Sequence, residues 1–331
     1  MPRVFSGIQP SGELHIGNLL GAVQNWVALQ ERYECIYCVV DLHAITFPYE
    51  RELLSARTRE MAISLLAAGI DPTRSILFVQ SHVPEHAELQ WLFTSVAPLG
   101  ELERMTQFKD KAQRLETVPV GLLQYPVLQA ADILLYRADL VPVGEDQAQH
   151  LELTREVARR WNQQFAPEQP YFPEPQALHT EVKRLPGLDG KAKMSKTLGN
   201  TIGITESPEA IWEKLRPTIT DPARVKRTDP GEPLKCPVIY PLHRYFSPPD
   251  VVDLVERNCR GAGWGCIECK RVLADHLIAA LAPIRERVLE LQQQPDEVDR
   301  ILAEGAARAR AIARVTLREA KQRMGFFEGR S

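Results

Sequence analysis

The stretch Arg3-Val-Phe-Ser-Gly-Ile-Gln-Pro-Ser-Gly-Glu-Leu-His-Ile-Gly-Asn-Leu-Leu-Gly21 decides the predicted fold, because a short apolar segment runs directly into an amphipathic one. A loop containing Pro10 and Gly12 separates the two, and the apolar residues after His15 recur at helical spacing. The same alternation continues along the chain and predicts an α/β fold with a doubly wound parallel sheet. We predict strands at residues 3–8, 35–41, 75–80 and 139–143, and helices at residues 15–33, 51–68 and 147–162.

The predicted secondary structure changes after about residue 205. Strand signals stop there, and helical patterns joined by Pro-rich segments follow. At 331 residues the chain is long enough for two domains. We therefore predict a parallel-sheet domain over residues 1–205 and a helical domain over residues 206–331, whose last helix can pack back on the first domain.

Composition excludes several classes of protein. Hydrophobic residues make up 44%, charged residues 25%, and mean hydropathy is −0.24, which are typical values for globular proteins. Neither a long apolar run nor a secretory signal is visible, so we expect no membrane association and a cytoplasmic location. The net charge of −3 means that any nucleic-acid binding would depend on a local patch.

The segment around His15 has the residues of a phosphate site. His15 and Asn18 are three residues apart, so both could donate hydrogen bonds to one bound phosphate at the start of a helix. Gly17 would let a nucleotide approach the backbone, and Gly21 would keep the same face open for its base or ribose. The alternative is that His15 only begins the helix and that the glycines only allow packing.

A second segment, Lys193-Met-Ser-Lys-Thr197, lies in a polar loop flanked by glycines. Two lysines three residues apart can neutralise the charge that develops on a leaving pyrophosphate. Considered alone, this segment is better explained as a solvated basic loop.

Together the two segments resemble the His-Ile-Gly-His and Lys-Met-Ser-Lys-Ser signatures of class I aminoacyl-tRNA synthetases, with Asn18 and Thr197 at the last positions. Residues 5–12, 100–111, 130–136 and 141–147 resemble the bacterial tryptophanyl-tRNA synthetases, and the likeness covers essentially the whole chain. The resemblance implies a Rossmann-type catalytic domain, a helical anticodon-binding domain and a homodimer. It also implies that the enzyme activates L-tryptophan with ATP and Mg²⁺ and then esterifies tRNA(Trp).

The resemblance also implies the nucleotide-binding residues. Lys111, Lys193 and Lys196 would hold the β- and γ-phosphates, and with His15, Asn18 and Ser195 they form the implied catalytic set. The ATP-binding residues would be Gln9, Pro10, Ser11, Gly17, Asn18, Gly21, Gly144, Glu145, Asp146, Leu185, Lys193, Met194, Ser195, Lys196 and Thr197.

For the amino acid, the family assigns Asp132 as the acceptor of the indole N–H. A carboxylate of this kind would reject phenylalanine, which would leave it unpaired in an apolar pocket, whereas tyrosine must be excluded by pocket shape. The alternative for Asp132 is a helix N-cap. Tyr125 and Gln147 would bind the α-amino end, Phe5, Val141 and Val143 would line the ring slot, and Gln129 stands where many bacterial members have methionine.

The cysteines fall into two groups. Cys35 and Cys38 lie on a predicted strand and point to opposite faces, so we predict that they are buried without a shared metal. Cys236, Cys259, Cys266 and Cys269 follow the spacing Cys-x22-Cys-x6-Cys-x2-Cys, which resembles the variant of the family that carries a 4Fe-4S cluster. A Zn²⁺ site and four unligated cysteines are the alternatives.

Two further expectations concern partners. The apolar run at residues 87–98 is predicted to support the dimer interface, and the basic stretch at residues 303–323 is either a solvated helix face or an RNA contact. Two other functions remain open at this point. One is a nucleotidyltransferase that adenylates its substrate without tRNA, and the other is a redox-responsive RNA-binding relative that has lost catalysis.

Overall fold

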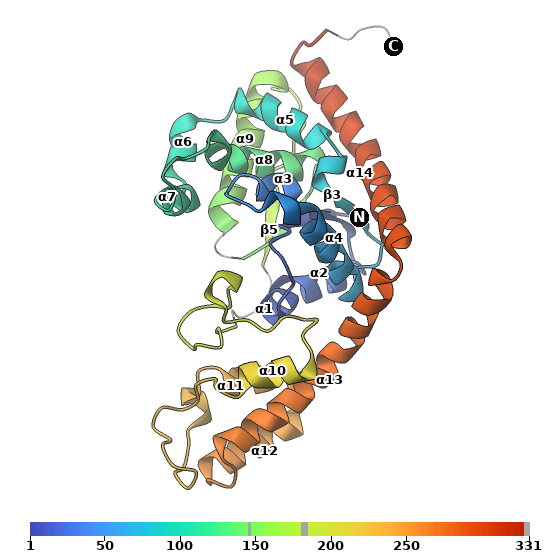
Figure 1. The fold of residues 1–331 in the computed structure, drawn as a ribbon. Coiled ribbons are helices and arrows are strands. Elements are labelled where there is room, and N and C mark those ends of the chain that lie inside the picture. The colour runs from blue at the N-terminus through green and yellow to red at the C-terminus, as the bar shows by residue number, and fades with distance from the viewer. Residues whose placement is uncertain (145–146, 180–184, 328–331) are drawn as a thin grey trace. The chain divides into compact units, whose positions relative to one another are not determined.

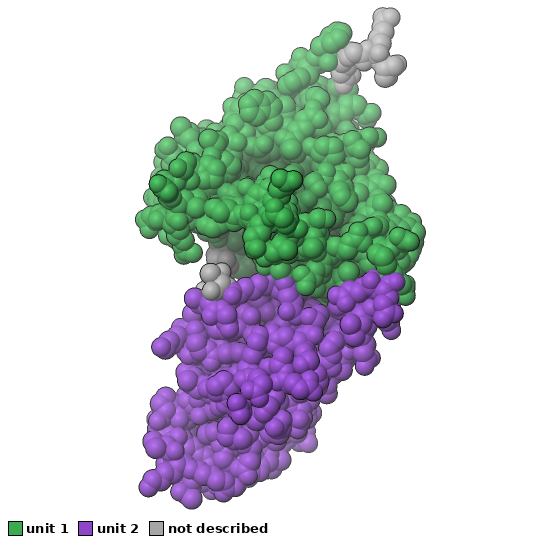
Figure 2. Space-filling view, in the orientation of Figure 1, with its two compact units in different colours: residues 1–12, 25–181, 294–331 green, residues 13–24, 182–293 purple. Residues whose placement is uncertain are grey.

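The computed structural model describes residues 1–144, 147–179 and 185–327. Contact density divides the chain into two compact units, which Figure 2 colours separately. Unit 1 comprises Met1–Gly12, Asn25–Glu181 and Gln294–Ser331, and unit 2 comprises Glu13–Gln24 and Val182–Gln293. These units divide the chain differently from the boundary expected at residue 205. The assignment of catalytic and anticodon-binding domains concerns function and stays a prediction.

Unit 1 is built on a parallel sheet of five strands in the order β3-β2-β1-β4-β5 (Figure 1). This arrangement confirms the predicted Rossmann-type fold. The order reverses beside β1, and ligands bind at the carboxyl ends of the strands next to such a switch point. The strands are β1 (Arg3–Ile8), β2 (Glu34–Val39), β3 (Ile76–Val79), β4 (Leu140–Val143) and β5 (Gln176–His179).

Helices cover the sheet of unit 1 and make up most of unit 2, which confirms a helical C-terminal part (Figure 1). None of the described helices is long and apolar enough to cross a membrane. Those of unit 1 include α3 (Asp41–Ala44), α4 (Arg51–Ala67), α5 (Glu85–Thr94), α6 (Leu99–Arg104), α7 (Thr106–Ala112), α8 (Val120–Leu135), α9 (Ala148–Phe165) and α14 (Pro295–Arg323). Those of unit 2 include α1 (Ile16–Asn18), α10 (Pro208–Leu215), α11 (Ile239–Phe246), α12 (Pro249–Arg260) and α13 (Cys266–Gln292).

The helix predicted at residues 15–33 is not continuous. After α1 the chain makes a π-helical turn over Leu19–Val23 and resumes as α2 (Gln24–Leu29). Gly21, a poor helix former, lies in the middle of the π turn. α2 ends four residues before the predicted bound, and the side chain of Gln30, just beyond it, donates to the carbonyl of Gly69 and accepts from the N–H of Asp71 in the loop between α4 and β3.

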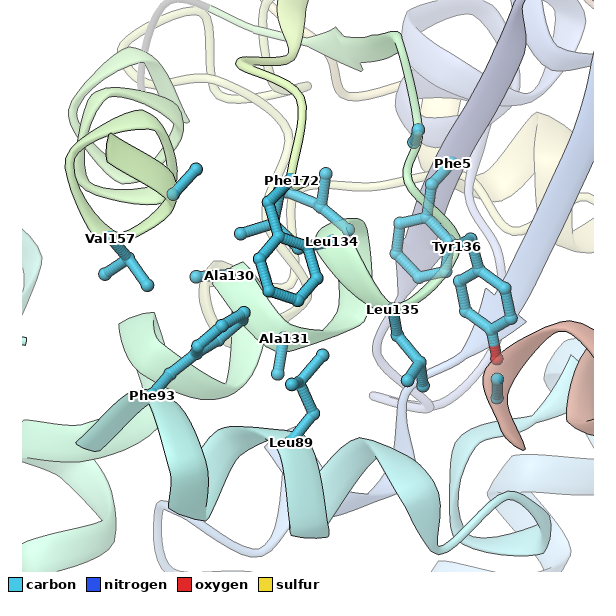
Figure 3. Close-up of a cluster of buried hydrophobic side chains, with 14 of the residues drawn as sticks. Phe5, Leu89, Phe93, Ala130, Ala131, Leu134, Leu135, Tyr136, Val157 and Phe172 are labelled. Atoms are coloured by element: carbon cyan, nitrogen blue, oxygen red, sulfur yellow. The ribbon is translucent and has the colours of Figure 1, made fainter. Parts of the chain in front are cut away.

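The core of unit 1 surrounds α8, which packs between α5 and α9 (Figure 3). Phe5 of β1 stacks on Tyr136, at the end of α8, with ring centroids 5.5 Å apart. Phe93 of α5 meets Phe172 edge to face. α8 is therefore held from several sides, which fixes the polar residue it carries at position 132.

The run at residues 87–98 belongs mostly to this core. Leu89, Leu92 and Phe93 of α5 are buried inside the chain, whereas Trp91 is 70% exposed. The hydrophobic surface predicted for this run is therefore limited, because Leu89, Leu92 and Phe93 pack inside the chain and Ala87 and Trp91 are the exposed apolar residues of α5; the dimer interface itself stays a prediction.

The basic residues near the C-terminus bind α14 to the rest of unit 1. Arg308 donates to the carbonyls of Pro72 and Ser75, and Lys321 pairs with Glu88 of α5. Arg310 and Arg314 both pair with Glu85. Each of these four residues has a partner within unit 1, but Arg308 and Arg314 remain exposed, and an RNA contact of this stretch stays a prediction.

Close packing accompanies these ion pairs. At Gly305 of α14, an added Cβ would lie 1.8 Å from the carbonyl oxygen of Leu77 on β3. Only glycine allows the helix to approach the strand backbone this closely.

Candidate active site and cysteine pocket

Asp132 lies within α8 and is 1% exposed, so the alternative that it is a helix N-cap was wrong. Three side chains bond its carboxylate. Oδ1 accepts from Nε2 of Gln80 and lies 2.6 Å from Nδ1 of His86, and Oδ2 lies 2.7 Å from Nε2 of His43. Gln129 is not among these partners. It lies half-buried on α8.

The charge state of Asp132 follows from these neighbours. Burial alone would raise its pKa, but His43 and His86 hold the pKa well below its usual range. The carboxylate is therefore ionised at neutral pH and can only accept hydrogen bonds. Its three partners use three of about four lone-pair positions, so one acceptor position of the carboxylate is unused.

The other residues assigned to the amino acid also belong to unit 1. The Tyr125 hydroxyl donates to Oε1 of Gln107 at 3.2 Å and lies 2.7 Å from Nε2 of His150. The ammonium of Lys111 lies 4.9 Å from the centre of the Tyr125 ring, and burial lowers the pKa of Lys111. Phe5 and Val141 are buried, whereas Val143 and Gln147 are half-buried.

His15 is the N-cap of α1. Its Nδ1 accepts from the backbone N–H of Asn18 at 3.3 Å, and Oδ1 of Asn18 accepts from the backbone N–H of His15 at 3.4 Å. Burial, with Lys196 as a second cause, lowers the pKa of His15 to about 4. The imidazole is therefore neutral at pH 7, and because Nδ1 accepts, Nε2 carries the proton and is a donor.

The two glycines of this segment differ in what surrounds them. A Cβ on Gly17 would lie 2.9 Å from the ring of His15 and 3.3 Å from Cβ of Met194, so this glycine makes room for the capping histidine. Its expected role in admitting a nucleotide stays a prediction. Among the described residues, no atom outside the helix's own backbone and the two chain neighbours lies within 4 Å of a Cβ placed on Gly21, so that side of the helix is open.

Asn200 organises the loop that carries Lys193 and Lys196. Its Oδ1 accepts from the backbone N–H of Ser195 at 2.7 Å, and its Nδ2 donates to the carbonyl of Lys193 and to Asp189. The loop also pairs with the chain before it. Lys193 bridges to Pro186, and the N–H of Met194 donates to the carbonyl of Leu185.

The two signature segments are joined within unit 2. His15 forms an antiparallel bridge with Gly203, just beyond the lysine loop. On either side of it the N–H of Ile16 donates to Ile202, and the N–H of Ile204 donates to Leu14. This pairing explains why residues 13–24 group with residues 182–293, and it brings His15 within electrostatic reach of Lys196.

The remaining nucleotide-binding predictions lie on loops. Gln9 and Ser11 are exposed after β1, with Pro10 buried between them, and Gly144 is exposed after β4. Glu145 and Asp146 lie outside the described residues, as does the side chain of Thr197.

The four clustered cysteines line one pocket of unit 2. Cys236, Cys259, Cys266 and Cys269 surround about 380 Å³ of empty volume, open solvent at its mouth included, together with Arg224. Burial raises the pKa of Cys236, Cys259 and Cys269. All six cysteines are free thiols, and within the described ranges no three His, Cys, Asp or Glu side chains could hold a single metal ion as placed. Cys35 and Cys38 are buried in β2, as predicted.

Two basic residues near this pocket have partners within unit 2. The Lys270 ammonium donates to the carbonyls of Arg216 and Thr218 inside the unit. Arg260 pairs with Glu232. Lys270 is therefore held inside the unit, whereas the side chain of Arg260 stays 48% exposed.

Sequence reasoning missed His43, Gln80, His86 and Asn200. Gln80 directly follows β3, and His43 lies in the short α3 that comes after β2; polar residues at the carboxyl ends of parallel strands are a signal that could have identified them. His86 carried no comparable signal, because its partners Asp132 and Tyr136 lie on a separate segment, and Asn200, whose partners lie in its own loop, belongs to no recognised motif.

Comparison with known proteins agrees with this geometry. The family model of tRNA synthetases class I (W and Y) matches residues 1–282. A tryptophan–tRNA ligase of Deinococcus radiodurans is 54% identical, covering 99% of this chain and 100% of the relative, and one of Thermotoga maritima is 44% identical, covering 97% and 98%. The crystal structure of the Campylobacter jejuni tryptophanyl-tRNA synthetase complexed with ADP and tryptophan matches with a TM-score of 0.91 at 34% identity, covering 98% of this chain and 100% of that one. With these matches over nearly its whole length, the chain belongs to the class I tRNA synthetases of the tryptophan and tyrosine group.

Proposed function

We propose that the chain activates L-tryptophan with ATP to tryptophanyl-adenylate and transfers it to tRNA(Trp), releasing AMP and pyrophosphate. The observation that carries this proposal is the joining of the two signature segments through the bridge between His15 and Gly203. It places a neutral histidine donor and the lysine loop on one structural unit. Full-length relatives named tryptophan–tRNA ligase support the choice of amino acid.

In the activation step, catalysis consists of positioning and charge stabilisation. The tryptophan carboxylate attacks the α-phosphorus, and pyrophosphate leaves. Nε2–H of His15 can donate to a phosphate oxygen, and Lys193, Lys196 and Lys111 neutralise the charge on the β- and γ-phosphates. Mg²⁺ reaches the site with the phosphates of ATP, which is the usual mode for this ion.

Asp132 selects the amino acid in this proposal. Its ionised carboxylate offers its remaining acceptor position to the indole N–H. Phenylalanine has no donor and would leave this acceptor unpaired in a dry pocket. Tyr125 and Gln147 bind the α-amino end, while Phe5 and Val141 line the ring slot.

Charging of total tRNA with each amino acid in turn tests the function. We expect ATP-dependent charging with tryptophan alone. Tryptophan-dependent pyrophosphate exchange without charging would favour the nucleotidyltransferase alternative. Binding of tRNA with neither activity would favour a relative that has lost catalysis.

We further propose that the four clustered cysteines hold a 4Fe-4S cluster. Their convergence on one largely buried pocket fits a cluster, in which each thiolate binds a different iron and the sulfurs stand apart. A single Zn²⁺ ion needs all four sulfurs within about 2.3 Å of one point. The cluster would fix the extended segment at Cys236 against the turn before α13, and so position an RNA-binding surface.

Purification without oxygen tests the cluster. A brown protein with about four iron atoms per chain is expected, whereas a colourless protein with stoichiometric zinc would contradict it. Cys266→Ser should lose iron and tRNA charging but keep tryptophan-dependent pyrophosphate exchange. Cys35→Ala, which changes a buried cysteine of β2, is the matched control and should keep its iron.

We propose that the enzyme works as a homodimer, as the family resemblance implies. Trp91 on α5 and Val120 at the start of α8 are 70% and 67% exposed, which is unusual for large apolar side chains of unit 1. Mass measurement in solution tests this state. An active species of 37.4 kDa, the mass of one chain, would contradict it.

A further inference from the structure

His86 has two hydrogen bonds and no exposed surface. Its Nδ1 lies 2.6 Å from Oδ1 of Asp132, and its Nε2 lies 2.7 Å from the hydroxyl of Tyr136. Because the ionised carboxylate can only accept, Nδ1 must carry a proton in either charge state of the imidazole. The bond to Tyr136 holds the other side of the ring, so that the donor stays directed at Oδ1.

Glu85, the residue before His86 in α5, is bonded by side chains of α14. Glu85 is 6% exposed, and its Oε1 accepts from Nε of Arg310 at 2.8 Å and from Nε of Arg314 at 3.3 Å. Both arginines belong to α14. The first turn of α5 is therefore fixed by the C-terminal helix on one side and bonded to Asp132 on the other.

The Glu85 carboxylate is the buried member of this contact, since its side chain is 7% exposed and that of Arg310 is 39% exposed. Surface ion pairs contribute little to stability, but removing the partner of a buried carboxylate leaves its charge less compensated. Without Arg310, Glu85 would have to move toward water or keep only Arg314. Either change shifts the first turn of α5, and His86 with it.

We propose that His86 is a positioning residue for tryptophan recognition, and that Arg310 of α14 sets its place through Glu85. This inference rests on the proposed function, because the acceptor that His86 orients is the one assigned to the indole N–H. His86 occupies one lone pair of Asp132 and thereby directs the remaining acceptor position. The C-terminal helix thus contributes to amino-acid selection without lining the pocket.

The first test compares His86→Ala with His86→Asn in tryptophan-dependent pyrophosphate exchange. The alanine variant loses one hydrogen bond to a charged group, so we expect its KM for tryptophan to rise about 10- to 100-fold, with the KM for ATP within about twofold of the wild type. The amide of asparagine can replace the Nδ1–H donor, so His86→Asn should recover most of the loss. A residue that only supports folding would raise both KM values or lower kcat, with no rescue by asparagine.

The second test addresses Arg310. Arg310→Ala should raise the KM for tryptophan several-fold and leave the KM for ATP unchanged. Arg308→Ala, from the same helix, removes bonds to the carbonyls of Pro72 and Ser75 instead and is the matched control. Adding Arg310→Ala to His86→Ala should produce no further rise, because the two act through one path.

If His86→Ala does not fold, Tyr136→Phe removes only one hydroxyl, and a several-fold rise in the KM for tryptophan is expected. An unchanged KM for tryptophan in the folded His86 or Tyr136 variants would overturn the inference while leaving the proposed function intact. Equal effects of Arg310→Ala and Arg308→Ala would overturn the role of α14. Absence of tryptophan-dependent exchange in the wild type would instead overturn the proposed function itself.

Discussion

The backbone N–H of Ser195 donates to Oδ1 of Asn200 across 2.7 Å, and this bond fixes the centre of the loop between the two lysines. Nδ2 of the Asn200 side chain donates to the carbonyl of Lys193 at 3.3 Å. A single buried side chain therefore determines the backbone path on which both lysines depend.

Asn200→Ala should lower the rate of pyrophosphate exchange. We expect a fall of about 10- to 100-fold, because a buried hydrogen-bond partner is lost and the lysines are no longer held in place. Asn200→Asp keeps the acceptor for Ser195 and should retain more activity. Leu198→Ala changes an exposed residue of the same loop and is the control. Equal rates for Asn200→Ala and the control would contradict this role.

Lys196→Ala should reduce pyrophosphate exchange by about 100- to 1000-fold, which is the typical effect of removing one group that stabilises developing charge. Tryptophan affinity should change little, because the side chain acts on the phosphates. Lys191→Ala is a matched control, since this lysine is exposed in the same loop. Unchanged exchange kinetics in Lys196→Ala would refute the assignment.

His15 makes stability depend on pH. Burial and Lys196 lower its pKa to about 4 in the folded chain, from an ordinary value of 6.5. The unfolded chain therefore binds more protons between these values, so the stabilising contribution is complete above pH 6.5 and is lost as pH falls toward 4. We expect His15 to account for a loss of about 1–3 kcal/mol over this range.

Urea unfolding at a series of pH values checks this expectation. His15→Asn keeps a side-chain oxygen that can cap α1 but has no titrating group, so its unfolding free energy should fall less over the same range. Parallel curves for the wild type and the variant would show that His15 does not titrate in this way.

Gly305→Ala should destabilise unit 1 by about 2–4 kcal/mol, because the added Cβ would meet the backbone of β3. Gly121→Ala is the matched control, since its nearest contact, at 3.8 Å, is ordinary packing and the residue lies in a helix. The control should match or exceed wild-type stability. Thermal unfolding of both variants makes the comparison, and similar melting temperatures would contradict the close approach of α14.

The sequence predicts those elements whose apolar pattern is visible within their own residues. β1, α4 and β3 form where apolar runs and helical spacing place them, and they end within about two residues of the predicted bounds. β5 escapes prediction because its four residues, Gln-Ala-Leu-His, are too few to show a period. The π turn at Leu19–Val23 has no pattern of its own, since its apolar residues also fit an ordinary helix.

The candidate site is likewise predictable only where its residues belong to a local motif. The His15 and Lys193 segments carry recognisable motifs, but the partners of Asp132 come from separate elements, and no local pattern connects His43 with His86. The sequence could not divide the run at residues 87–98 between core and surface, for a related reason. Its apolar residues could cover a partner or fill a core, and only the packing of α5 against α8 decides between these outcomes.

Pyrophosphate exchange measured side by side with tryptophan, tyrosine and phenylalanine tests the central claim most directly. The family includes enzymes for both tryptophan and tyrosine, so the comparison addresses the choice of amino acid as well as the chemistry. We predict exchange with tryptophan, its loss in Asp132→Ala, and none with phenylalanine or tyrosine at equal concentration. Exchange supported by tyrosine as well as by tryptophan, or tryptophan-dependent exchange that survives Asp132→Ala, would contradict the account.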